Sequence, residues 1–227
     1  MGLLDTVDLG VFKRSETWKA FVIAATMFVA ISFAALSMFD SMDDIFQSDA
    51  DPEPIPNIAF ESLNRTDIES PIVNETGWLT TDELRGSIVI FDMMAHDCSN
   101  CHAVQYHLEE NMEDWQNLAL QNNKTLHIIA YGSWYGEDLN YLNDSDSKYS
   151  VPLYPTGMGY ENSATLSSGD TTDPVRLFTT GGAGQIPVVM VIDEEGYIIE
   201  RQTTGSPVDK WQSFDSVVEL AVSTPVT

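Results

Sequence analysis

The two cysteines are the residues of this sequence with the most distinctive chemistry. Cys98 and Cys101 are the only cysteines among 227 residues, and two residues separate them. Structural disulfide frameworks use more cysteines and close longer loops, whereas an isolated C-x-x-C pair suits thiol–disulfide exchange or metal binding. The pair therefore indicates a redox site or a metal site, and the elements around it must position either one.

Cys98 is predicted to lie where a buried strand is followed by a helix. Residues 87–93 (SIVIFDM) form an apolar, β-branched run, and a helical pattern follows the cysteines through Leu108 to Leu120. A sulfur at a helix N-terminus lies among unpaired N–H groups, which stabilise the thiolate. We therefore expect Cys98 to be the attacking thiol and Cys101, one turn further along, to be the resolving thiol.

The rest of the C-terminal region alternates strand and helix patterns. Beyond the first strand and helix, we predict strands at 125–131, 187–192 and 197–202, a turn at 194–196 and an amphipathic helix at 208–222. Residues 132–186 form a long insertion between the second and third strands, with short apolar pieces at 139–142 and 175–178. These patterns predict an α/β domain with a central mixed sheet flanked by helices.

The N-terminal region predicts a membrane anchor. Residues 20–39 contain no charge and no proline, and as a helix they would span the hydrocarbon core of a bilayer. Basic residues precede this segment and acidic residues follow it, so 1–19 should lie in the cytoplasm and the C-terminal bulk outside the cell membrane. A cleaved signal peptide is the alternative, although the apolar stretch exceeds the usual ~7–15-residue signal core.

An acidic, proline-containing segment at 40–57 predicts an extended tether, and 58–227 form the predicted globular domain. The whole chain has 35 acidic and 10 basic residues, a formal net charge of -25, which disfavours nucleic acid as a partner. Four Asn-x-Ser/Thr sequons agree with an exported surface. They begin at Asn64, Asn74, Asn123 and Asn143.

Three stretches of the sequence resemble a known family. VIFDMMAHDCSNC resembles the active-site strand and turn of thioredoxins, and the segment from Trp78 to Ser87 (WLTTDELRGS) resembles the lead-in of membrane-anchored, TlpA-like members. QIPVVMVIDEEGYIIE resembles the cis-proline strand and hairpin of that family. The resemblance covers most of residues 58–222 and implies a thioredoxin fold with a long insertion before the cis-proline strand.

The same resemblance implies roles for individual residues. Asp92 would lie buried beneath the cysteines and relay a proton for Cys101. Pro187 would follow a cis bond beside the pair, and the backbone of Ile186 would pair with the bound substrate strand. The implied activity is an extracytoplasmic thiol–disulfide oxidoreductase that exchanges disulfides with exported proteins and needs no cofactor besides the Cys98–Cys101 disulfide.

The sequence departs from the family pattern beside the cysteines. Thioredoxins place an aromatic residue before the first cysteine and often a proline between the two, whereas this chain has Asp97 and then Ser99 and Asn100. A carboxylate at 97 should oppose formation of the Cys98 thiolate, while the two polar residues can donate hydrogen bonds to sulfur. The direction of the redox chemistry therefore stays open.

Three alternatives remain open for the same residues. The sequence C-x-x-C-H fits a c-type haem attachment with His102 as axial ligand. His96, Cys98, Cys101 and His102 could instead bind copper or zinc in a thioredoxin-fold metallochaperone. A non-catalytic interaction domain with a structural disulfide is the third. Aromatic residues of the insertion are expected in the core rather than on a partner surface; they are Trp134, Tyr135, Tyr149, Tyr154 and Tyr160.

Overall fold

The structure is a computed structural model, which describes residues 53–63, 77–136, 138–142, 151–179, 185–203 and 207–224. These residues belong to one compact unit, Pro52–Thr227. The predicted cytoplasmic segment (1–19), membrane helix (20–39) and most of the tether (40–57) lie outside the described residues. Within the described ranges, none of the helices has both the length and the apolar character needed to cross a bilayer.

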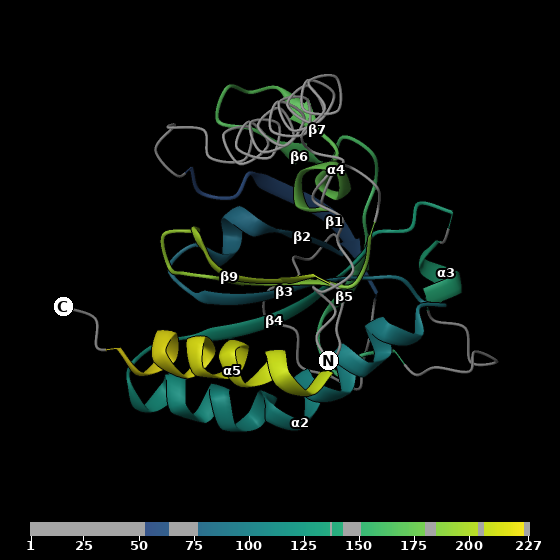
Figure 1. Ribbon diagram of the computed structural model, residues 1–227. Helices are drawn as coiled ribbons and strands as arrows, with labels where there is room; N and C mark the ends of the chain where they lie inside the picture. The colour runs from purple at the N-terminus through teal and green to yellow at the C-terminus, as the bar shows by residue number, and fades with distance from the viewer. Residues whose placement is uncertain are drawn as a thin grey trace, which may run out of the picture. The chain divides into compact units, whose positions relative to one another are not determined.

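A mixed β-sheet forms the centre of the domain (Figure 1). The strands of the described ranges are β1 (Asn57–Ser62), β2 (Trp78–Thr80), β3 (Ile88–Met94), β4 (Leu126–Gly132), β5 (Thr156–Met158), β6 (Ala164–Thr165), β7 (Thr171–Thr172), β8 (Val188–Ile192) and β9 (Ile198–Thr203). Their order is β7-β6-β1-β5-β4-β3-β8-β9, and β2 pairs with β1. At the centre, β3 runs parallel to β4 and antiparallel to β8.

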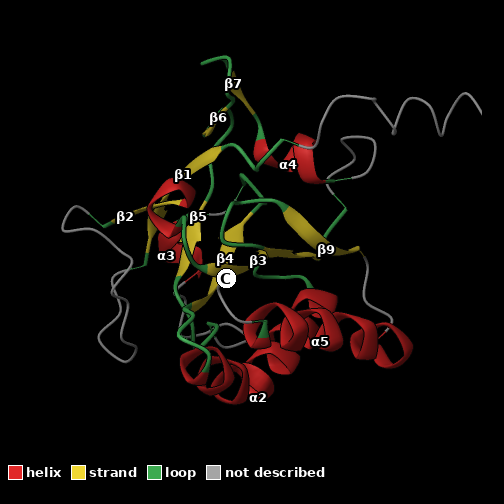
Figure 2. Ribbon diagram, turned by 90° about the vertical axis from the view of Figure 1, so that its left-hand side faces the viewer, coloured by secondary structure: helices red, strands yellow, loops and turns green. Residues whose placement is uncertain are grey.

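The helices of the described ranges are η2 (Thr81–Leu84, a 3-10 helix), α2 (Ser99–Gln121), α3 (Leu139–Leu142), α4 (Pro174–Phe178) and α5 (Pro207–Ser223). Helices α2 and α5 lie side by side and cover one face of the central strands, whereas α4 lies on the other side of the sheet (Figures 1 and 2). Both faces of the sheet are therefore covered, as expected for strands that are continuous apolar runs.

Strand β3 connects the two halves of the hydrophobic core. All seven of its residues are buried, and successive side chains of a strand point to opposite faces. Ile88, Ile90 and Met94 pack in the cluster formed with α2 and α5. Phe91 and Met93 pack in the cluster on the other face, which includes β1 and α4. By this alternation Asp92, between Ile90 and Met94, lies on the face covered by α2 and α5.

The predicted elements are confirmed with shifts of one or two residues at most of their ends. Strands β3, β4, β8 and β9, helices α2 and α5, and the two short pieces now seen as α3 and α4 correspond to predicted segments. The insertion, however, also contributes β5, which pairs parallel to β4 and antiparallel to β1. The insertion is therefore part of the central sheet, and it links β1 to β4.

Candidate functional site

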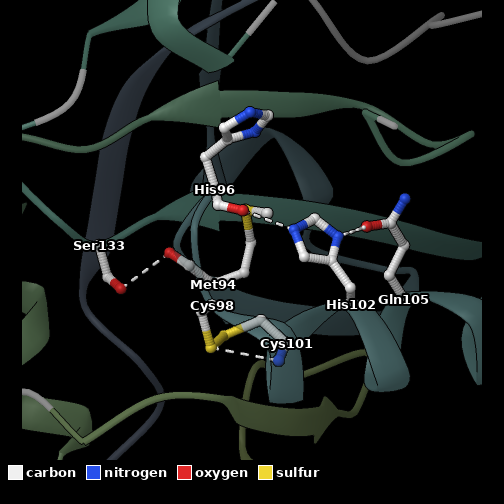
Figure 3. Close-up of a disulfide and its surroundings, with 7 residues drawn as sticks. All are labelled: Met94, His96, Cys98, Cys101, His102, Gln105 and Ser133. Atoms are coloured by element: carbon white, nitrogen blue, oxygen red, sulfur yellow. Dashed lines mark hydrogen bonds between the residues drawn. A yellow bond between two sulfur atoms is a disulfide. The ribbon is translucent and has the colours of Figure 1, made fainter. Parts of the chain in front are cut away.

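Cys98 and Cys101 form a disulfide at the start of helix α2, with an S–S distance of 2.08 Å. The helix begins at Ser99, and the Cys98 sulfur accepts a hydrogen bond from the Cys101 backbone N–H at 3.2 Å (Figure 3). Cys98 is partly buried, whereas Cys101 is only 1% exposed. One sulfur is thus more accessible to an attacking group, and it lies at the electropositive end of a helix.

Asp92 lies on β3 and is 0% exposed. The phenol of Tyr154 donates a hydrogen bond to Asp92 Oδ2 at 2.9 Å. The other carboxyl oxygen, Oδ1, has no hydrogen-bond partner among the described residues. Asp92 shares the α2-facing side of the sheet with Cys101, which packs in the cluster that contains Ile90 and Met94.

Burial determines the titration of this carboxyl group. Loss of water around the charged form raises the pKa of Asp92 from 3.8 to about 7, and the hydrogen bond from Tyr154 opposes part of that rise. The group therefore exchanges its proton near neutral pH, where a proton relay for a thiol is most effective. Asp92 is thus buried, as the resemblance implied, and its role as proton relay stays a prediction.

Ile186 and Pro187 lie at the same edge of the sheet as the cysteines. The peptide bond between them is cis, which confirms that prediction. Pro187 immediately precedes β8, whose Val188 and Val189 pair with Met93 and Asp92 of β3. Ile186 packs against the same hydrophobic cluster as Cys98. The sequence-predicted site residues therefore lie at one end of the β3–β8 pair and at the start of α2.

The His102 side chain connects helix α2 to the loop before the cysteines by a hydrogen bond (Figure 3). Its ring is 2% exposed. Nε2 donates to the His96 carbonyl oxygen at 2.6 Å, and Nδ1 lies 2.6 Å from Gln105 Oε1. The side chain of Ser133, at the end of β4, donates to the Met94 carbonyl oxygen at 2.9 Å on the opposite side of this loop. These contacts give His102 a positioning role that sequence reasoning did not find.

The haem and metal alternatives require ligands that this arrangement already uses. Both sulfurs are bonded to each other, and both ring nitrogens of His102 have partners within the protein. The His96 ring points away from the disulfide (Figure 3). Across the described ranges, no group of three or more His, Cys, Asp or Glu side chains is placed to hold a metal ion. The geometry therefore favours disulfide chemistry.

Part of the insertion contacts the residue before Cys98. The Tyr141 hydroxyl of α3 donates to Asp97 Oδ2, and the Tyr141 ring lies 5.3 Å from the His96 ring. Of the aromatic residues expected in the core, Tyr154 is buried, whereas Trp134 and Tyr160 are 56% and 43% exposed. The core expectation was thus wrong for those two residues, and Tyr149 lies outside the described residues.

The fold is thioredoxin-like: the mixed sheet carries α2 and α5 on one face, the disulfide opens α2, and a cis-proline precedes β8. The structure is similar to that of a proposed protein disulfide isomerase from Bacteroides thetaiotaomicron, with a TM-score of 0.53, 17% identity and coverage of 76% of this chain and 90% of that chain. This likeness confirms the predicted thioredoxin-like α/β fold with a mixed sheet and flanking helices.

Two further solved structures match with lower TM-scores. A thioredoxin-family thiol:disulfide interchange protein from Chlorobium tepidum has a TM-score of 0.46 and 21% identity, with coverage of 77% of this chain and 99% of that chain. A secreted thiol-disulfide isomerase from Corynebacterium glutamicum has a TM-score of 0.45 and 16% identity, with coverage of 78% and 90%. No family model matches the sequence, and no curated protein matches it either.

Proposed function

We propose that this protein is a thiol–disulfide oxidoreductase that exchanges disulfides with partner proteins through Cys98 and Cys101. The observation that carries the proposal is the asymmetry of the pair: the more exposed cysteine caps the N-terminus of a helix, and the buried cysteine lies on the same side of the sheet as a protonatable carboxyl group. Structural disulfides do not need a buried acid beside them, because an uncompensated buried carboxyl group costs stability.

The proposed reaction has two exchange steps. When the pair acts as a reductant, the Cys98 thiolate attacks a sulfur of the partner disulfide, which forms a mixed disulfide and releases one partner thiolate. Asp92 then accepts the proton of Cys101, whose sulfur attacks Cys98 Sγ and releases the second partner thiolate. Two electrons pass from the pair to the partner, and the same steps run backwards when the pair acts as an oxidant. Asp92 donates a proton in that direction.

Variants of the two cysteines test this assignment with a defined probe. The reduced full-length Cys101→Ser protein, mixed with glutathione disulfide, should accumulate a stable glutathione adduct on Cys98, because the resolving thiol is missing. The wild type should form the Cys98–Cys101 disulfide without accumulating the adduct. Mass spectrometry measures both products.

Cys98→Ser is the matched control. Its remaining thiol is 1% exposed in the disulfide form, so the adduct should form much more slowly than on Cys101→Ser. Equal rates for the two variants would overturn the assigned roles. A wild-type protein that forms no disulfide with glutathione disulfide would overturn the proposed function itself.

We further propose that this chemistry takes place outside the cytoplasm, with residues 20–39 as a membrane anchor and exported proteins as partners. The uncharged segment, the basic residues before it and the acidic residues after it support this topology. A membrane-impermeant thiol reagent, added to intact cells under mild reduction, should label Cys98 in the Cys101→Ser variant. Labelling only after lysis would contradict the topology.

A further inference from the structure

Tyr154 connects the insertion to the buried acid of the site. The two residues lie 62 positions apart in the sequence, and the phenol hydroxyl donates to Asp92 Oδ2 at 2.9 Å. Tyr154 is 2% exposed and Asp92 is 0% exposed. A hydrogen bond between two buried side chains is not weakened by competing water, so this contact has more influence on the carboxyl group than a surface contact would have.

The backbone around Tyr154 is fixed on both sides. The Leu153 N–H donates to Glu109 Oε1 of α2 at 2.7 Å, and the Pro155 carbonyl oxygen accepts from the Ala130 N–H of β4 at 2.8 Å. The Tyr154 carbonyl oxygen accepts from the Thr156 hydroxyl at 2.9 Å. Tyr154 is therefore held by both α2 and the sheet, as a side chain with a positioning role requires.

The strand order requires Tyr154 to reach across β4. Tyr154 stands just before β5, and β4 lies between β5 and β3. The β4 residue opposite Asp92 is Ala130, and the β8 residue opposite it is Val189. The small Ala130 side chain leaves room for the phenol, and both neighbours are apolar, so neither can share the proton of Asp92.

The other titratable groups that act on this pair or pack in its cluster come from α2. On α2, Cys101 packs in the same cluster as Tyr154. Burial, then the charge and hydrogen bond of Asp92, and last the charge of Glu109 raise the pKa of the Tyr154 phenol well above 10.0. Helix α5 contributes apolar side chains to the same cluster; they are Trp211, Phe214, Val218 and Val222. Tyr154 therefore stays protonated at physiological pH and can act on Asp92 only as a donor.

We propose that Tyr154 is a positioning residue for thiol–disulfide exchange. It holds Oδ2 of Asp92, leaves Oδ1 to exchange the proton with Cys101, and sets the pH range in which the exchange occurs. This inference rests on the proposed function, and it assigns a role to the insertion. The segment between β4 and β8 supplies the hydrogen bond that Asp92, the buried acid of the site, accepts.

Reduction of the oxidised protein by dithiothreitol provides a balanced step for the test. A reagent thiolate attacks Cys98 Sγ and forms a mixed disulfide; the Cys98–Cys101 bond breaks, and its electron pair stays on Cys101 Sγ, which takes the proton of Asp92. The second reagent thiolate then displaces the Cys98 thiolate and closes the cyclic reagent disulfide. The protein pair gains two electrons, and the reagent loses two.

The first measurement is the titration of Asp92 in the oxidised full-length protein, followed by carboxyl ¹³C NMR. The wild-type midpoint should lie near 7. Tyr154→Phe removes only the hydroxyl that favours the charged form, so its midpoint should rise by roughly one pH unit. Asp92→Asn identifies the resonance by its loss. This measurement does not depend on redox activity.

The second measurement is the rate of reduction by dithiothreitol between pH 5.5 and 8.5, expressed as the ratio of variant to wild type so that the titration of the reagent cancels. Tyr154→Phe keeps the Asp92 proton to higher pH. Its ratio should be near one below pH 6 and rise above pH 7, up to about tenfold for a shift of one unit. Asp92→Asn should fall below the wild type at low pH, because it has no proton to donate.

Tyr160→Phe is the matched control, because it removes a hydroxyl of the same insertion that donates to Glu61 Oε2 at 3.1 Å. It should change neither the midpoint nor the rate ratio. An unmoved midpoint in Tyr154→Phe overturns the inference, and so does a moved midpoint with an unchanged rate profile. A wild-type disulfide that exchanges with neither dithiothreitol nor glutathione overturns the proposed function instead, whatever the NMR midpoint shows.

Discussion

Replacement of Asp92 by asparagine should make the oxidised protein more stable, and the gain should grow with pH. In the folded protein the pKa of Asp92 is raised from 3.8 to about 7 by burial, whereas in the unfolded chain it returns to about 3.9. The folded state thus holds this proton more tightly. The stability that the group contributes is complete below pH ~4 and is lost as the pH rises through about 7.

The size of the effect follows from the shift. A rise of about three units, at ~1.36 kcal/mol per unit, gives a difference of about 4 kcal/mol between the acidic and the alkaline limit. No discount for solvent applies, because the side chain is fully buried. The side-chain amide of the Asp92→Asn variant does not titrate, and its oxygen can still accept the hydrogen bond of Tyr154, so the substitution adds only a constant offset.

Urea unfolding of the full-length, oxidised wild type and Asp92→Asn proteins from pH 4 to pH 8.5 measures this difference. The free energy of unfolding of the variant minus that of the wild type should rise with pH, most steeply up to about pH 7. Asp82→Asn is the control, because it removes a carboxylate whose side chain is 57% exposed, and its difference should stay nearly flat. A flat difference for Asp92→Asn would refute the raised pKa and, with it, the proton relay.

Three further changes test other parts of the structure. Asp97→Asn removes a negative charge beside Cys98. Iodoacetamide should therefore alkylate the reduced protein roughly two- to fivefold faster at pH 6.5. An unchanged rate would mean that solvent screens this charge. Lys124→Met removes the 3.0 Å ion pair with Glu194 and should lower the free energy of unfolding by about 2 kcal/mol in urea; a neutral effect would contradict a stabilising pair. Gly159→Ala would place a Cβ 1.9 Å from the buried ring of Tyr131. The free energy of unfolding in urea should fall by about 1–3 kcal/mol. Wild-type stability would show that the ring can move aside.

The central strand and the helix after it could be predicted from the sequence, because both carry strong local patterns. Residues Ile88–Met94 form an unbroken apolar run around one acid, and α2 extends over 23 residues. The resemblance then supplied the roles of Asp92 and Pro187. Those predictions depended on residues close to the cysteines in the sequence or on a strand with a distinctive pattern.

The contribution of the insertion could not be predicted, because it depends on contacts between distant residues. Strand β5 has only three residues, too few for a period to appear, and its place is fixed by pairing with β4 and β1. For the same reason nothing near Tyr154 in the sequence pointed to Asp92. His102 fitted a haem or metal ligand until its contacts to the His96 carbonyl oxygen and Gln105 were known.

The position of β5 also determines the order in which the site can be completed during synthesis. The cysteines are three positions apart, so the nascent chain can join them as soon as α2 has emerged, whereas Tyr154 follows Asp92 by 62 residues. Between Cys101 and Tyr154 the ribosome adds 53 residues (154 − 101), which at about 5–20 residues per second takes roughly three to eleven seconds. For that interval β1 also lacks its link to β4. The newly made thiols are then present without the tyrosine whose hydrogen bond lowers the pKa of Asp92.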